Sequence, residues 1–153
     1  MYIRVIAAFF FVVIGVFFQF QIGDIYGVWL NFTLAALISL SFVLNFPELL
    51  FIILFALFAL NWQPGISFEL IVFGIVPIGS FLAGKFLPFE PWAGNILLTL
   101  IGIMIPYVLF GIHVILKSPV LFVGDSIASL FYSAIIFKAM ISFFPSREQD
   151  SLS

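Results

Sequence analysis

The side chains in this chain that could take part in chemistry are few and widely spaced. The sequence holds five Lys and Arg residues, seven Asp and Glu residues and one His, and it holds no Cys. The lack of cysteine excludes disulfides, thiolate catalysis and cysteine-ligated metals. The single imidazole, His113, cannot by itself form a metal site or a bis-histidine haem site. We therefore expect no metal and no cofactor.

Two aspartates, Asp24 and Asp125, each follow a glycine and could in principle form an acid–base pair. Two carboxyl groups that share one site are the catalytic arrangement of membrane aspartyl proteases. The stretches around these two residues show none of the Asn-containing motifs of such enzymes, so we interpret both as loop or helix-capping residues. No P-loop, Rossmann glycine pattern or nucleophile motif occurs either. The sequence therefore predicts a protein that is not an enzyme and has no catalytic residue.

The composition determines the class of protein. Of the 153 residues, 65% are hydrophobic, 20% are aromatic and only 8% are charged, and the mean hydropathy is +1.35. So few charged side chains cannot cover the surface of a water-soluble domain of this size. The remaining apolar surface must face lipid, which is the first partner that we expect. A net charge of −2 gives no basic surface for nucleic acid.

Charged residues, Pro and Gly divide the chain into long apolar segments. A membrane span needs about 20 mostly apolar residues, and the breakers predict an all-α, polytopic transmembrane bundle within a single domain, 1–144. The predicted spans are 3–21, 28–45, 47–62, 68–87, 91–116 and 121–144. The third segment is short, since sixteen helical residues extend only about 24 Å against a hydrocarbon core of about 30 Å. Six spans are expected, with five as the alternative if the third segment does not cross.

The distribution of positive charge predicts the orientation. With six spans and both termini in the cytoplasm, Arg4, Lys85, Lys138 and Arg147 lie on the cytoplasmic side and only Lys117 lies outside, as the positive-inside rule favours. The hydrophilic tail, 145–153, would then be cytoplasmic. We expect a multi-pass protein of the cell (inner or plasma) membrane.

Most charged residues have a structural explanation as markers of helix ends, because acids are favoured at helix N-termini and bases at C-termini. Lys138 is the exception, since it lies inside the last predicted span. Its stem can carry the ammonium group to the interface, and the alternative is an interhelical ion pair with Glu48 or Glu90. His113 is interpreted as an interfacial or helix-packing residue in preference to a proton relay.

Small and amide side chains within the spans are candidates for helix–helix contacts. Gly79 and Ala83 are spaced by four residues, as are Ser80 and Gly84, which supplies small faces for close approach of helices. Asn95, inside the predicted fifth span, is a candidate for an interhelical hydrogen bond.

Several stretches together resemble the rod shape-determining MreD family, whose members are small, strongly apolar bacterial membrane proteins. The paired early segments Leu34–Leu44 and Pro47–Trp62 are similar to that family's early helices. Gly79–Lys85 is similar to its glycine-spaced helix with a basic end, and Phe89–Trp92 opens a long apolar helix. Asn61–Gly65 stands where the family often has an acidic residue, so no binding residue is carried over.

The resemblance implies a non-enzymatic scaffold component of the bacterial cell-elongation machinery. It also implies MreC-like and cell-wall synthase proteins as membrane partners. The alternative is a transport component, since substrate-binding subunits of energy-coupling-factor transporters have a similar size and hydropathy. Such a subunit normally needs a pocket with more convergent polar groups than this sequence shows.

Overall fold

The computed structural model describes residues 2–26, 31–61 and 67–144, and nearly all of these residues are helical. The predicted tail, 145–153, with Arg147, lies outside the described residues, as do the structure of 62–66 and the side chain of Asp24. The helices are α1 (Tyr2–Tyr26), α2 (Phe32–Ser41), α3 (Phe46–Leu60), α4 (Phe68–Gly84), α5 (Pro91–Leu109), α6 (Ile112–Lys117) and α7 (Pro119–Phe143).

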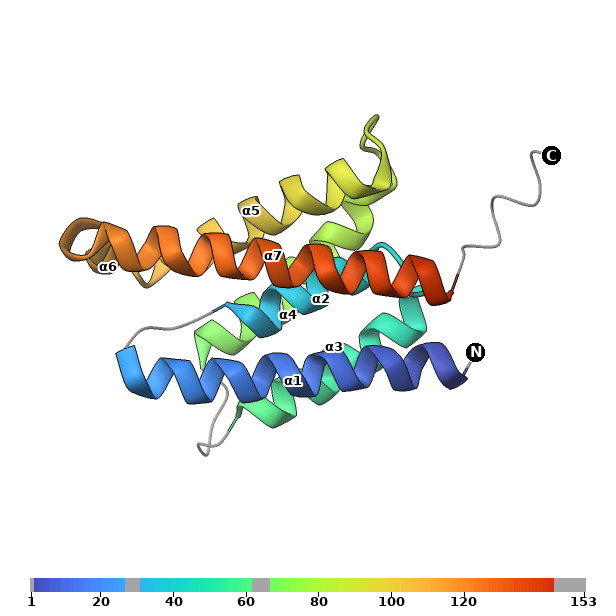
Figure 1. Cartoon of the computed structure of the whole chain (residues 1–153), viewed down its shortest axis with the longest axis horizontal. Coiled ribbons are helices and arrows are strands. Elements are labelled where there is room, and N and C mark those ends of the chain that lie inside the picture. The colour runs from blue at the N-terminus through green and yellow to red at the C-terminus, as the bar shows by residue number, and fades with distance from the viewer. Residues whose placement is uncertain (1, 27–30, 62–66, 145–153) are drawn as a thin grey trace.

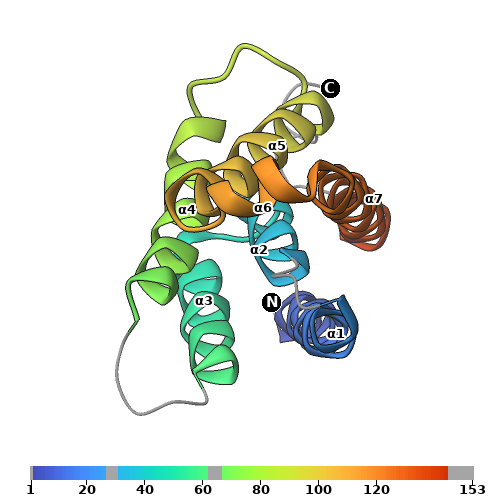
Figure 2. The same cartoon turned by 90° about the vertical axis from the view of Figure 1, so that its left-hand side faces the viewer.

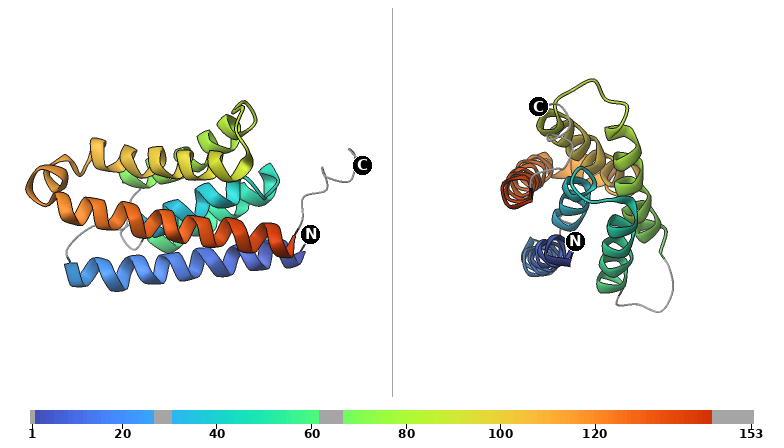
Figure 3. Two further views of the ribbon diagram at one scale, coloured as in Figure 1. Left: turned by 45° about the horizontal axis from the view of Figure 1, so that its top comes forward. Right: turned by 90° about the vertical axis from the view of Figure 1, so that its right-hand side faces the viewer.

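The shortest helix of the main bundle, α2, lies at its centre. It contacts α1, α3, α4, α5 and α7, and the views from both ends show it enclosed by them (Figures 2 and 3). Every residue from Phe32 to Ser41 is buried. A helix without a distinct polar face can pack against neighbouring helices on all of its sides.

The long helices run in alternating directions along the bundle axis (Figure 1). We call one end of the bundle, which holds the first turn of α1 and the last turn of α7, the terminal end. The opposite end is the α6 end, because α6 lies across it (Figure 2). Helices α1, α3 and α5 run from the terminal end to the α6 end, and α2, α4 and α7 run back.

Three helices of the described chain are long and apolar enough to cross a membrane. They are α1, over 3–22, together with α5 and α7. Helices α2, α3 and α4 are shorter apolar helices of 10–17 residues. Large apolar side chains cover the outside of the bundle, including Phe10, Phe58 and Phe131, which are 62%, 82% and 69% exposed. Such a surface is typical of an integral membrane protein.

Two of the predicted segments differ from the helices that form. The predicted continuous span over 91–116 is wrong, because the helix ends at Leu109 and the chain turns before α6 begins at Ile112. Gly111 permits this turn, since a Cβ at that position would lie 3.0 Å from Cδ1 of Tyr107. The second helix is also shorter than its predicted range, 28–45.

Glycines set the closest helix contacts. A Cβ on Gly84 or on Gly94 would lie 3.2 Å from the ring of Phe42, so α4 and α5 both approach this aromatic ring closely. A Cβ on Gly102 of α5 would collide with Cδ1 of the buried Ile38 in α2. These contacts hold α5 against the central helix and thereby fix the positions of the buried polar side chains between them.

Candidate functional site

Asp125 lies in the second turn of α7 and is only 2% exposed. Its Oδ1 accepts hydrogen bonds from the backbone N–H of Asn31 and from Oγ of Ser129, both at 3.2 Å. Its Oδ2 accepts from Nδ2 of Asn31 at 3.0 Å and from the hydroxyl of Tyr107 at 2.8 Å. Within the described part of the chain, no Lys, Arg or His side chain contacts this carboxyl group. Neutral donors from three parts of the bundle therefore surround a buried carboxyl group.

The hydrogen bonds to Asp125 help to cap the N-terminus of the central helix, α2. The first N–H groups of any helix have no partner within it, and the side chain of Asn31 makes no cap hydrogen bond to α2. Asp125 of α7 accepts from the N–H of Asn31, and Oε1 of Gln19 in α1 accepts from the N–H of Thr33 at 3.3 Å. A carboxylate at this position also interacts favourably with the helix dipole. Side chains from two other helices thus cap α2.

A second polar cluster lies two helical turns further along α7, around Ser133. Its hydroxyl is within 2.6 Å of Oγ of Ser39 in α2 and 2.8 Å of Oγ1 of Thr99 in α5. Nδ2 of Asn95 donates to it at 3.0 Å. All four side chains are at most 1% exposed. The second cluster therefore joins the same three helices, α2, α5 and α7, as the first does.

An ion pair lies at the terminal end. Nη2 of Arg4 in α1 donates to Oε2 of Glu48 in α3 at 2.6 Å, and the backbone N–H of Asn45 donates to the same oxygen at 3.0 Å. The Glu48 side chain is 5% exposed and the Arg4 side chain 23%. Glu48 thus caps α3 and holds α1 against it. The alternative interpretation of Lys138 as the partner of Glu48 or Glu90 is wrong, because Glu48 pairs with Arg4 and Glu90 accepts from Trp92.

The residues that were predicted to pack between helices differ in their surroundings. Asn95 is buried in the cluster around Ser133, and Gly84 lies against Phe42. Ala83 packs beside the small core formed by Leu34, Ile38, Phe73 and Leu98. Gly79 faces outward, and no described atom lies within 4 Å of where its Cβ would stand. Gly79 therefore forms no close contact with another described helix.

The two predicted polar positions outside these clusters are exposed. His113 lies in α6, on the outside of the α6 end. Lys138 lies on the outer face of α7, and among the described residues it makes no ion pair. Neither side chain belongs to the buried polar network.

The interpretation of Asp125 as a loop or helix-capping residue is correct in its second part only. Asp125 lies inside the continuous helix α7, not in a loop, and the helix that it caps is α2. The sequence carried a signal for this network, since Asp125, Ser129 and Ser133 recur at intervals of four residues and so lie on one helix face. Asn95 and Thr99 are likewise four residues apart in α5, whereas Tyr107 and Ser39 offered no comparable pattern among their own neighbours.

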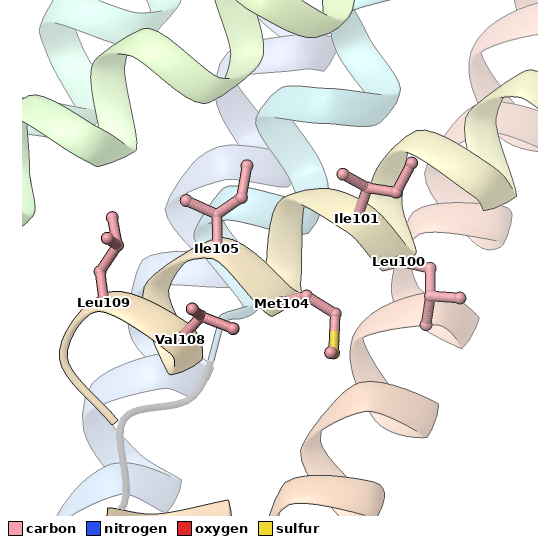
Figure 4. A pocket seen from close by; sticks show the side chains of 6 residues that line it. All are labelled: Leu100, Ile101, Met104, Ile105, Val108 and Leu109. Atoms are coloured by element: carbon pink, nitrogen blue, oxygen red, sulfur yellow. The ribbon is translucent and has the colours of Figure 1, made fainter. Parts of the chain in front are cut away.

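The buried groups are suited to holding helices together. They are hydroxyl, amide and carboxyl groups, and among the described residues no group of three or more His, Cys, Asp or Glu side chains could hold a metal ion. A hollow of about 370 Å³ lies on the outer face of α5, and Figure 4 shows its lining, which is entirely apolar. Its residues are Leu100, Ile101, Met104, Ile105, Val108 and Leu109. A hollow with this lining offers no polar group to orient a polar ligand.

The fold and the network together define a class of protein: an all-helical membrane protein whose central helix is held by interhelical hydrogen bonds. No protein-family model matches the chain, and comparisons with curated proteins and with solved structures find no match either.

Proposed function

We propose that this chain is a six-span integral membrane protein that serves as a non-enzymatic scaffold for other membrane proteins. The proposal rests on how polar and apolar side chains are divided between the interior and the surface of the bundle. Buried polar side chains such as Asn95, Asp125 and Ser133 are engaged in bonds between helices, whereas the large exposed side chains are apolar and rich in Phe. Such a surface is suited to packing against lipid and against the helices of partner proteins.

The direction of the helices supports six spans with both termini in the cytoplasm. Six alternating helices bring the start of α1 and the end of α7 to one end of the bundle (Figure 1). Arg4, Lys85 and Lys138 lie in the parts of α1, α4 and α7 nearest this end, and Lys117 lies in α6 at the other. The positive-inside rule then favours a cytoplasmic terminal end. Helix α2 is too short to span alone, at about 15 Å for ten residues, but the five helices that it contacts separate it from lipid.

The resemblance to the MreD family gives the proposal its cellular setting. It favours a place in the cell-elongation machinery of the bacterial plasma membrane, with MreC-like and cell-wall synthase proteins as partners. The open face around Gly79 supports a partner helix there. Gly79 lies between the exposed side chains of Ile75 and Leu82, which are 61% and 50% exposed. A small residue on such a face lets a second helix approach closely.

Co-purification tests the scaffold role. The tagged full-length chain, extracted in mild detergent, is expected to retain an MreC-like partner and to carry no stoichiometric small molecule. Gly79→Leu should weaken this association while the chain still folds. Gly124→Leu is the matched control, because Gly124 is also an exposed helical glycine with no described atom within 4 Å of a Cβ.

A vitamin or other small molecule retained stoichiometrically through purification would contradict the scaffold role and favour the transport alternative. Equal association of the Gly79→Leu and Gly124→Leu variants would show that the partner binds elsewhere.

A further inference from the structure

Asp125 accepts four hydrogen bonds, two from hydroxyl groups and two from N–H groups. Each carboxyl oxygen accepts one bond from a hydroxyl group and one from an N–H group. Oδ1 has Ser129 and the backbone N–H of Asn31, and Oδ2 has Tyr107 and Nδ2 of Asn31. A hydroxyl group can rotate to accept a hydrogen bond, whereas an N–H group can only donate. The surroundings of this carboxyl group can therefore accommodate an added proton.

We propose that Asp125 is a reversible proton-binding site whose occupation loosens the N-terminus of the central helix. The proton comes from water at the α6 end and forms an O–H bond at Oδ1 or Oδ2. The new O–H then donates to Ser129 or to Tyr107, whose hydroxyl hydrogen turns away. The contact with that hydroxyl group thus survives in the reversed direction, and the other hydroxyl group continues to donate to the carboxyl group.

The two hydrogen bonds from Asn31 cannot reverse, because their N–H groups can only donate. They change from charge-assisted bonds to weaker neutral ones when the carboxylate loses its charge, and charge-assisted bonds are roughly twice as strong. The favourable interaction between the carboxylate and the dipole of α2 is lost at the same time. Protonation therefore acts selectively on the contact between α7 and the start of α2.

The position of Asp125 makes exchange with water feasible. It follows Pro119 by six residues, which places it about 9 Å along α7 from the α6 end. Of the described elements packed against this part of α7, α5 contributes Tyr107, and α6 contributes His113 and Lys117, both exposed. Helix α2 has no titratable residue, and the described charged side chain of α1, Arg4, lies at the opposite end.

Aspartate-specific labelling tests the site without altering it. The chain contains three aspartates, Asp24, Asp125 and Asp150, so carboxyl-¹³C aspartate gives three NMR signals. Asp24→Asn and Asp150→Asn identify the other two signals and leave Asp125 intact. Spectra are recorded from about pH 9 down to pH 4, and the chemical shift of the Asp125 signal is expected to change as its carboxyl group takes up a proton.

Hydrogen exchange measured over the same pH range tests the consequence. Amides at the start of α2 should lose protection by about tenfold, relative to α4, as Asp125 becomes protonated. Helix α4 in a Glu69→Gln background is the internal control, because the neutral hydroxyl of Ser67 caps it and Glu69 is the acidic residue of its first turn. The change should persist in His113→Gln and disappear in Asp125→Asn.

Three outcomes would overturn the proposal. One is an Asp125 signal that does not move, which would make the residue a permanent cap. Another is titration of Asp125 without a matching change in α2. The third is loss of the response in His113→Gln, which would assign it to the imidazole.

Discussion

At Ser133, three side chains from two neighbouring helices converge on one hydroxyl group. Asn95 and Thr99 reach it from α5 and Ser39 reaches it from α2. In the apolar interior of a membrane bundle, a polar group that loses its partner has no water to replace it. Ser133 therefore matters more to the bundle than its small size suggests.

Ser133→Ala should lower the free energy of unfolding by about 1–2 kcal/mol, because it leaves fully buried hydroxyl and amide groups without this partner. Ser126→Ala is the control on the same helix, since among the described residues Ser126 bonds only to the carbonyl of Phe122, one turn earlier. Reversible unfolding in detergent micelles measures the difference. Equal effects from the two substitutions would show that the interhelical bonds contribute nothing.

Two of the cationic residues near the terminal end, Arg4 and Lys138, should respond differently to removal of their charge. Arg4→Leu leaves the Glu48 carboxylate, 5% exposed, without its cation, and we expect a loss of about 1–3 kcal/mol in stability. Lys138→Leu should be nearly neutral because Lys138 is exposed on α7. Thermal unfolding of both variants checks this. A severe loss of folded protein for Lys138→Leu would indicate a partner outside the described residues.

At the scale of helices, the approach of α5 to α2 depends on the missing side chain at residue 102. A Cβ there would collide with Cδ1 of Ile38 and lie 3.1 Å from Cγ1 of Val76. Ile38 is completely buried, so its side chain has little room to move.

Gly102→Ala should therefore destabilise the chain by about 1–3 kcal/mol through overpacking, although alanine favours helix by about 1 kcal/mol. Gly79→Ala serves as the control, because its Cβ meets open space, and it should be neutral or stabilising. Ile38→Val removes the colliding Cδ1 and should restore part of the loss in the double variant. Additive effects of Gly102→Ala and Ile38→Val in unfolding experiments would contradict this packing.

The helices could be predicted from sequence because their boundaries are local features. Hydropathy together with Pro47, Pro91 and the charged residues located most of them within a few residues. The break between α5 and α6 was missed because Gly111 and the ring of Tyr107 act together there. The role of Asp125 was also missed, since its partner Asn31 lies 94 positions away in the chain. Hydropathy and spacing cannot reveal which helix end a distant carboxylate will cap.

At the scale of the whole molecule, the six alternating helices predict which surfaces face each side of the membrane. Ser67 and Ser118 belong to the α6 end, and Phe86, which is 85% exposed, belongs to the terminal end.

With a cytoplasmic terminal end, Ser67→Cys and Ser118→Cys should react with a membrane-impermeant maleimide in intact cells, and Phe86→Cys should not. The chain has no other cysteine to interfere. Permeabilised cells provide the control, in which all three should react. Labelling of Phe86→Cys alone in intact cells would contradict this topology, since that pattern is expected both from the reversed orientation and from the five-span alternative in which the third segment does not cross.

The capping of α2 by α7 also has a consequence for the order in which the protein is made. A ribosome synthesises α2 early, yet the carboxylate that caps it and the hydroxyl group that joins it to α5 are both supplied by α7, the last helix. Until residues 119–143 have been added, the nascent chain holds its innermost helix without these partners. The centre of the bundle is therefore completed by the end of the chain, and a translation product that stops before α7 lacks the bonds that hold its earliest helices in register.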